Sequence, residues 1–263
     1  ISVNGNVLYA GGLFSCYGTT NAGPTCTGGT NRNRLAAIDV SANCLASWST
    51  SCAQGGTNPL RSWNPDADNL VRAISATDSA VYVGGNFTTI GVASRNRLAA
   101  IGNDGTVYAW NPDLNNYPLA IASTSNTIFV AGTFTTINTQ VRNRLAAIGT
   151  DGVLQAWSPN VNSTVNAIAA TGNSIFVGGD FSQINSTART RIAAIAPDGT
   201  LLSFNPVANS SVHSLSVANA KLYTGGYFSL IAGQTRNYLA AFDLSNNQLT
   251  SWNPNMNGAV SAI

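Results

Sequence analysis

The sequence predicts an all-β fold, a five-bladed β-propeller made of four-stranded antiparallel blades of about 47 residues. The first observation behind this prediction is a phenylalanine that follows two small residues and recurs every 47 residues, at Phe87, Phe134, Phe181 and Phe228. The second is an arginine triplet with the same step, whose first arginine stands at Arg95, Arg142, Arg189 and Arg236. A repeat of about 40–50 residues that holds four short strands is typical of a propeller blade.

The third observation is a large aromatic residue near the end of each copy, at Trp110, Trp157, Phe204 and Trp252. An earlier and less regular copy contains Gly11-Gly12, Phe14, Arg32-Asn33-Arg34 and Trp48. The chain therefore holds five copies of one unit, which predicts five blades.

The elements of a blade are clearest between residues 163 and 206. Four β-type runs are predicted there, at residues 165–169, 175–181, 191–196 and 201–204. Asp198-Gly199 predicts the hairpin turn between the third and fourth strands, because glycine accepts the positive φ that such turns need. The small-residue pair lies inside a strand pattern and predicts a close backbone approach or a β-bulge, not a phosphate-binding loop.

The first copy differs by two loop insertions, near residues 15–31 and 49–64. All four cysteines lie in this part of the chain, at Cys16, Cys26, Cys44 and Cys52. The single His213 is distant, so a metal site is less suitable than disulfides, and we predict the pairs Cys16–Cys26 and Cys44–Cys52. The insertions are the expected binding surface; alternatively they decorate the surface or seal the junction of the chain ends.

The two ends of the chain complement each other. Residues 259–263 resemble the first strand of a repeat, and residues 1–9 resemble the segment that comes after such a strand. We therefore expect residues 1–263 to form a single propeller domain whose first blade is completed by the C-terminal strand. The alternative is that the sequence is a piece of a longer repeat array.

The repeated pattern resembles the delta-60 repeat β-propeller family. The residues that carry the resemblance are Gly84-Gly85-Asn86-Phe87, Arg95-Asn96-Arg97-Leu98 and Asp104-Gly105, with their equivalents in the later copies. The resemblance covers the chain outside the two insertions. It implies a propeller fold and a role in large surface or secreted proteins.

The composition indicates an uncharged polar surface. All ten acidic residues are aspartates, Lys221 is the single lysine, and the formal net charge is +2. Such a weak field does not favour nucleic-acid binding. No apolar run is long enough for a membrane helix, so direct membrane insertion is not expected. We expect an extracellular or cell-surface protein without a cofactor.

The repeated arginines have two interpretations. Arg95 and Arg97, and likewise Arg142 and Arg144, are two residues apart and are expected on one face of a strand. They are candidates for an anion-binding ring. Alternatively, they bind backbone carbonyls or aspartates as part of the scaffold, since a feature of every blade is usually structural.

The aromatic residues also have two interpretations. Stacking on sugar rings would make a lectin with one site per blade, and packing between blades would be structural. The replacement of tryptophan by phenylalanine at Phe204 fits packing better. The candidates for stacking are Trp48, Trp63, Trp110, Trp157 and Trp252.

Catalytic groups are scarce, because the chain has one histidine and no glutamate. We therefore expect a non-enzymatic interaction, adhesion or structural module with a protein or glycan partner. A glycan-binding lectin is the second hypothesis, and a glycan-active enzyme with two aspartates is the third. Four sequons are candidate glycosylation sites, at Asn86, Asn162, Asn185 and Asn209.

Overall fold

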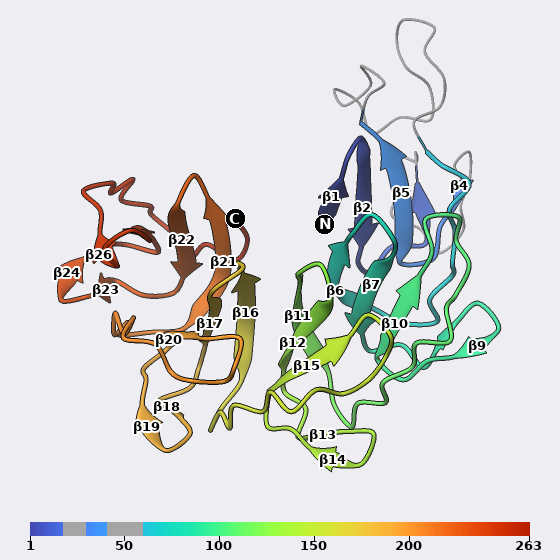
Figure 1. Cartoon of the computed structure of the whole chain (residues 1–263). Coiled ribbons are helices and arrows are strands. Elements are labelled where there is room, and N and C mark those ends of the chain that lie inside the picture. Colours follow the sequence, from blue (N-terminus) through green and yellow to red (C-terminus); the bar gives the residue numbers. More distant parts are fainter. Residues whose placement is uncertain (18–29, 41–59) are drawn as a thin grey trace, which may run out of the picture. The chain divides into compact units, whose positions relative to one another are not determined.

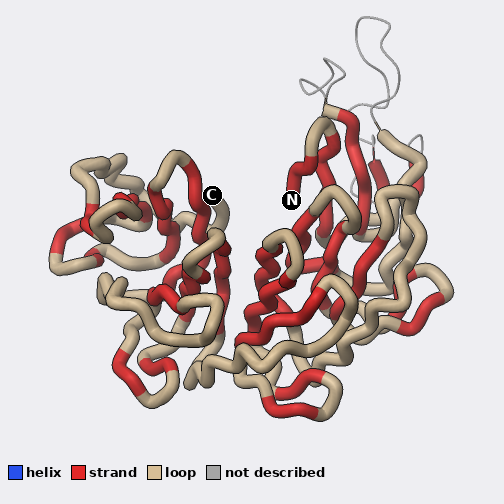
Figure 2. Tube along the Cα trace, in the orientation of Figure 1, coloured by secondary structure: helices blue, strands red, loops and turns tan. Residues whose placement is uncertain are grey.

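The computed structural model describes residues 1–17, 30–40 and 60–263. These residues form strands, turns and loops, with no helix among them (Figures 1 and 2). The all-β prediction is confirmed. The chain divides into two compact units, Ile1–Tyr117 and Pro118–Ile263, and each is described by itself.

Each repeat forms one antiparallel meander of three strands, to which the fifth repeat adds a fourth. The first unit contains the sheets of repeats one and two, and the second unit contains those of repeats three to five. The strands are β1 (Ser2–Asn4), β2 (Val7–Gly11) and β5 (Leu35–Asp39); β6 (Val71–Ala76), β7 (Val81–Gly85) and β10 (Leu98–Ile101); β11 (Pro118–Ser123), β12 (Thr127–Gly132) and β15 (Leu145–Gly149); β16 (Val165–Ala170), β17 (Ile175–Gly179) and β20 (Ile192–Ile195); β21 (Val212–Ala218), β22 (Lys221–Gly226), β25 (Leu239–Asp243) and β26 (Gln248–Leu249).

Among the described residues, the predicted fourth strand is present only in the fifth repeat, as β26. In the fourth repeat, residues 201–204 make one β-bridge, between Leu201 and Ile195, and one further hydrogen bond from the N–H of Leu202 to the carbonyl O of Ala194. The chain then leaves the sheet edge, because the side chain of Phe204 turns into the core. A strand at 201–204 was therefore wrong in extent, although its start was placed correctly.

A second ribbon of two short strands lies between the second and third strands of each repeat, and the sequence did not indicate it. The turn at Asn185-Ser186 has φ of 51° and 62°, and the turn at Asn138-Thr139 has φ of 47° and 66°. Positive φ at both central residues suits a tight hairpin turn. The ribbon strands are β3 (Cys16–Tyr17) and β4 (Thr30–Asn31); β8 (Thr89–Ile90) and β9 (Ala93–Ser94); β13 (Thr136–Ile137) and β14 (Gln140–Val141); β18 (Gln183–Ile184) and β19 (Thr187–Ala188); β23 (Leu230–Ile231) and β24 (Gln234–Thr235).

The Asp-Gly turns after the third strands are confirmed. Gly105, Gly152 and Gly199 have φ of 92°, 89° and 93°. The N–H of Thr200 donates to Oδ1 of Asp198 at 2.8 Å. This bond, followed by one from the Thr200 hydroxyl, holds the pKa of the exposed Asp198 carboxyl below its ordinary value of 3.8.

The small-residue pair serves two close approaches, as predicted. A β-carbon on Gly179 would lie 2.2 Å from the carbonyl O of Thr164, because β16 bulges between Val165 and Ala167. A β-carbon on Gly178 would lie 2.4 Å from Cγ1 of Val212, in the first strand of the next repeat. The lack of a β-carbon on the second glycine thus leaves room for the bulged backbone, and its lack on the first glycine leaves room for the valine of the neighbouring repeat.

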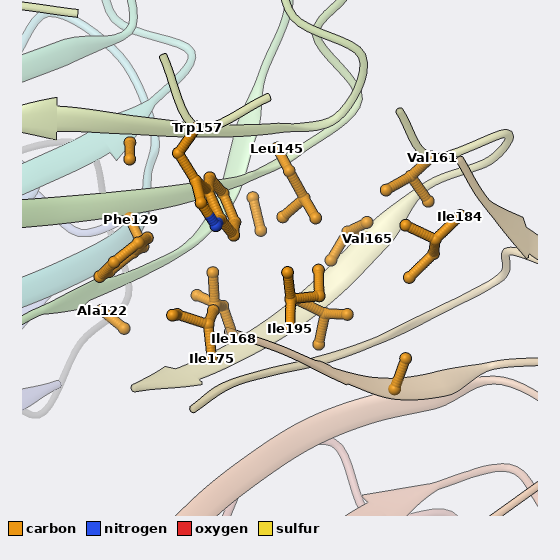
Figure 3. Close-up of a cluster of buried hydrophobic side chains, with 14 of the residues drawn as sticks. Ala122, Phe129, Leu145, Trp157, Val161, Val165, Ile168, Ile175, Ile184 and Ile195 are labelled. Atoms are coloured by element: carbon orange, nitrogen blue, oxygen red, sulfur yellow. The ribbon is translucent and has the colours of Figure 1, made fainter. Parts of the chain in front are cut away.

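The core lies between successive sheets. In the second unit, Ile175 and Val177 of β17 pack toward the third repeat, whereas Phe176 of the same strand packs toward the fifth. Figure 3 shows the first of these clusters, where Leu145 and Trp157 meet side chains of the fourth repeat. Both faces of the second strand are buried, which explains its continuous apolar sequence.

Candidate functional site

The first arginine of each triplet binds two backbone carbonyl groups of its own repeat. Nη1 of Arg189 donates to the O of Ala188 at 2.9 Å, and Nη2 donates to the O of Leu202 at 3.2 Å. The equivalent two bonds are made by Arg32, Arg95, Arg142 and Arg236. The guanidinium groups therefore join the ribbon to the segment after the third strand, which favours the scaffold interpretation of these arginines.

Neither arginine of the triplet lies in a strand, contrary to the expectation that both share a strand face. Arg97 and Arg191 have φ of 67° and 70°, in the left-handed region. The N–H of Arg191 donates to the carbonyl O of Phe181 at 2.9 Å, and that bond holds the bend. The same bond and a similar φ occur at Arg34, Arg97, Arg144 and Tyr238.

The side chain of the second arginine reaches different partners in different repeats. Nη1 of Arg97 donates to the O of Leu114 at 2.8 Å, and its Cζ lies 5.9 Å from the ring centroid of Tyr117. Nη1 of Arg191 donates to the carbonyl O of Asp180. The second arginine therefore lies beside residues that differ between repeats.

The aromatic residue near the end of each repeat lies edge-on against an aromatic residue of the second strand. The ring centroids of Trp157 and Phe129 are 5.1 Å apart at an interplanar angle of 74°. Nε1–H of Trp157 donates to the carbonyl O of Ala196, in the next repeat, at 3.1 Å. The other pairs are Trp63 with Tyr9, Trp110 with Tyr82, Phe204 with Phe176 and Trp252 with Tyr223.

These aromatic side chains are mostly inaccessible to a ligand. The exposed fractions of Trp63, Trp110, Trp157 and Phe204 are 3–6%, while that of Trp252 is 42%. Trp63 occupies the first repeat's aromatic position, and Trp48 lies outside the described residues. The burial of four side chains favours packing between repeats over stacking on sugars.

Two positions beside the bulge carry a different residue in each of repeats two to five. The first position is the bulged residue of the first strand, and the second lies between the small-residue pair and the buried phenylalanine. We call these the bulge-end residues: Arg72 and Asn86, Leu119 and Thr133, Asn166 and Asp180, and His213 and Tyr227.

The two bulge-end residues of a repeat contact each other in three of the repeats. Nε of Arg72 donates to Oδ1 of Asn86 at 2.7 Å. Nδ2 of Asn166 lies 3.4 Å from Oδ2 of Asp180, and the rings of His213 and Tyr227 are 4.9 Å apart. The scaffold thus presents a different pair at one place: cation with amide, amide with carboxylate, and imidazole with phenol.

One flanking residue extends this surface in each unit. In the first unit, Tyr117 is 38% exposed, and the Cζ of Arg72 lies 5.4 Å from its ring centroid. In the second unit, the hydroxyl of Ser211 donates to Oδ1 of Asp180. Exposed tyrosine and arginine side chains held in fixed positions are suited to contact with a macromolecule. Aligning the copies of the sequence and asking where they differ would have found these positions.

The predicted disulfides involve residues that are largely outside the described structure. Cys16 lies in β3, whereas Cys26, Cys44 and Cys52 lie outside the described residues, so both pairings remain predictions. Most of the two loop insertions lies outside as well. Within the described ranges, no three or more His, Cys or acidic side chains are grouped so that they could hold a metal ion. Those ranges also contain no helix with the length and apolar character needed to span a membrane.

The sequon asparagines take part in turns. Oδ1 of Asn162 accepts from the N–H of Ser182 and Nδ2 donates to its hydroxyl, and Asn209 makes the same two bonds with Ser229. Oδ1 of Asn185 accepts from the N–H of Asn160. Nδ2 of Asn162 and of Asn209, the atom to which a glycan would be attached, therefore already takes part in a turn.

Two segments of the chain, residues 125–154 and 173–201, match a family model described as "Domain of unknown function (DUF5122) beta-propeller". Each segment runs from the second strand of a repeat to the bridge after its Asp-Gly turn. The match supports propeller-type repeats, while the narrower resemblance to the delta-60 repeat family remains a prediction.

Solved structures with a similar fold include the computationally designed Ika4 protein, with a TM-score of 0.46, 13% identity, and coverage of 67% of this chain and 92% of that one. The WD40 domain of Pan2 from Neurospora crassa is similar with a TM-score of 0.48, 13% identity, and coverage of 82% of this chain and 58% of that one. No curated protein matches the chain.

Proposed function

We propose that this chain is a non-enzymatic β-propeller that serves as an interaction, adhesion or structural module outside the cell or at the cell surface. One observation carries the proposal. The repeated arginine and aromatic side chains direct their hydrogen bonds and buried area to the scaffold, whereas the bulge-end residues occupy equivalent places in repeats two to five and differ among these repeats. A constant frame with variable positions is suited to recognition.

The chemistry of the variable positions supports a protein or glycan partner. Tyr117 lies beside Arg72 and Arg97, and Tyr227 is 54% exposed beside His213. Arginine and tyrosine supply much of the binding energy of macromolecular interfaces. The low charge of the chain gives no support to a nucleic-acid partner, and its uncharged polar composition favours the extracellular location.

Closure of the five repeats into one ring is part of the proposal. Val260 lies against Gly225 as Val71 lies against Gly11 and as Val212 lies against Gly178. Val260 therefore occupies the position that begins the first strand of a repeat. In the closed ring, residues 259–263 complete the sheet of the first repeat. Trp252 is then buried between the sheets of two successive repeats, as the other tryptophans are.

Ring closure predicts slow hydrogen exchange at the indole N–H of Trp252. In the closed ring that N–H is buried and bonded, as the N–H of Trp157 is to Ala196. Exchange of ¹⁵N-labelled indoles, with the signal assigned by Trp252→Phe, is therefore expected to be slow for both residues. Fast exchange at Trp252 beside slow exchange at Trp157 would show that the ring is open.

The interaction role predicts binding to intact cells of the source organism through the bulge-end residues. The fluorescently labelled double variant Arg72→Ser, Tyr227→Ser is expected to bind about tenfold more weakly than the parent, because both anchors are lost. Prior treatment of the cells with protease or glycosidase distinguishes a protein partner from a glycan. The measurement is cell-associated fluorescence over a concentration series.

The matched control is Gln140→Ser, Val141→Ser, which alters two exposed residues of the ribbon strand β14. Both double variants are expected to melt within a few degrees of the parent, since their changes are at the surface. Absence of binding by the parent, or equal losses in both variants, would contradict the role assigned to the bulge-end residues.

A further inference from the structure

A pocket of about 400 Å³ lies in the second unit, between the end of the fourth repeat and the fifth repeat. Its walls are the segment Ser203–Pro206, the hairpin residues 246–249 and two residues of the β23–β24 ribbon, Ala232 and Gln234. The volume falls within the range of small-ligand sites, about 300–1,000 Å³. The pocket shares no residue with the bulge-end surface, so either site can exist without the other.

The pocket forms where two departures from the repeat pattern meet. At the equivalent junctions, a β-carbon on the turn residues Gly105 and Gly199 would lie 3.6 and 3.7 Å from Cδ1 of Trp63 and Trp157. The fourth repeat ends in Phe204 instead of tryptophan, and the phenyl group is smaller and has no N–H. It packs on Phe242 with ring centroids 5.2 Å apart.

The second departure is the hairpin between the third and fourth strands of the fifth repeat. It carries Asn246-Asn247 where the second, third and fourth repeats have Asp-Gly, it is one residue longer than in those repeats, and it continues into β26. Asn247 has a φ of 61°, which asparagine tolerates. The longer hairpin raises a wall beside the space that the smaller aromatic ring leaves.

The lining is amide-rich and uncharged. Phe204 and Phe242 are 3% and 0% exposed, so they support the pocket from beneath and offer almost no surface to a ligand. The exposed rim bears Asn205, Gln234 and Asn247. Within the described part of the chain, the side-chain amides of these three residues have no hydrogen-bond partner, and no lining residue carries a charge. Amides both donate and accept, so they match a ligand whose hydroxyl groups also do both.

We propose that this pocket binds a neutral sugar, either a free hexose or the terminal hexose of a glycan. A charged ligand would be desolvated there without a counter-charge, and a purely apolar ligand would leave the rim amides unpaired. The hydroxyl groups of a sugar can both donate hydrogen bonds to the rim amides and accept them, and a sugar needs no counter-charge. The site is single, because it arises from features that the other described junctions lack.

The test is isothermal titration calorimetry of the intact chain with glucose, galactose, mannose and N-acetylglucosamine, and with their methyl glycosides. Saturable binding of at least one sugar in the millimolar range is expected. Equal or tighter binding of the methyl glycoside assigns the site to glycan ends, and loss of binding assigns it to free sugar. Absence of saturable binding for the whole panel would overturn the proposal.

Two variants keep the test specific to the pocket. Phe204→Trp restores the side chain of the other repeats, and it is expected to fold and to weaken sugar binding at least fivefold. Asn247→Gly keeps the positive φ and removes one rim amide, and it is expected to weaken binding by a similar factor. The control Asn138→Gly makes the same change in the turn of the β13–β14 ribbon and is expected to bind like the parent. Folded Phe204→Trp and Asn247→Gly that bind like the parent would overturn the assignment.

Discussion

Replacement of Gly179 by alanine is expected to lower the free energy of unfolding by about 3 kcal/mol, the upper end of the usual cost of overpacking. The added β-carbon would lie 2.2 Å from the carbonyl O of Thr164 and 2.9 Å from Cα of Val165. Both atoms belong to the backbone, so no side chain can move aside. Relief requires the bulge in β16 to open, which breaks its register with β17.

The matched control is Gly172→Ala in the turn between the same two strands. A β-carbon at Gly172 would have no atom within 4 Å, and this glycine does not have a positive φ. Its unfolding free energy is expected to stay unchanged or to rise by about 0.5 kcal/mol, because alanine restricts the unfolded chain. Urea titration of both variants makes the comparison, and equal midpoints would show that the close approach at Gly179 costs nothing.

The sequence predicted those parts of the fold that local chemistry determines. The pair Gly178-Gly179 marks a place where no β-carbon fits, and Asp198-Gly199 marks a positive φ. Both signals recur with the period of the repeat, so the strand order and the turns were predictable. The β-bulge followed from the same glycine pair.

Nonlocal hydrogen bonds account for the features that the sequence did not reveal. Arginine has no preference for the left-handed region, yet Arg191 adopts it because its N–H bonds to Phe181 and its side chain reaches Asp180. The local sequence therefore predicted that Arg191 belongs to the strand that follows it. The β18–β19 ribbon, only two residues per strand, was too short for an alternating pattern to show.

The candidate site was predictable only in part. Periodicity directs attention to positions that are the same in every copy, such as Arg189 and Trp157, and the structure shows these side chains bound to backbone carbonyls. Positions such as Asn86, Asp180 and Tyr227 share one structural place and differ in chemistry. The variation between repeats marks these positions in the sequence. It indicates a candidate binding surface only once the structure shows that they occupy equivalent places beside the bulge.

The pocket beside Phe204 depends on two substitutions in different repeats. The sequence shows the phenylalanine and the longer hairpin at Asn246-Asn247 separately. Only the packing of the fifth repeat against the fourth brings them to one junction. Cavities between repeats are thus less predictable than the repeats themselves, because they depend on the difference between neighbours.

Replacement of Trp157 by alanine is expected to lower the free energy of unfolding by about 4 kcal/mol, the usual cost of removing a buried tryptophan. The indole is 5% exposed, lies edge-on against Phe129, and donates its N–H to the carbonyl O of Ala196. Its loss leaves a cavity between two sheets, and the carbonyl O of Ala196 keeps only the bond from the N–H of Gly199. Urea unfolding followed by circular dichroism measures the change.

Trp157→Phe separates packing from the hydrogen bond. Phe204 occupies the equivalent position in the next repeat, edge-on against Phe176 at 5.6 Å, so a phenyl ring fits this place in the scaffold. The phenylalanine variant should lose about 1 kcal/mol for the missing N–H bond, plus a smaller packing term. If it unfolds as readily as Trp157→Ala, the bond to Ala196 and not the wedge couples the two repeats. If Trp157→Ala lowers the free energy of unfolding by less than about 1 kcal/mol, neither the hydrogen bond nor the packing of the indole couples the two repeats. Removal of a tryptophan side chain buried to this extent should cost several times more.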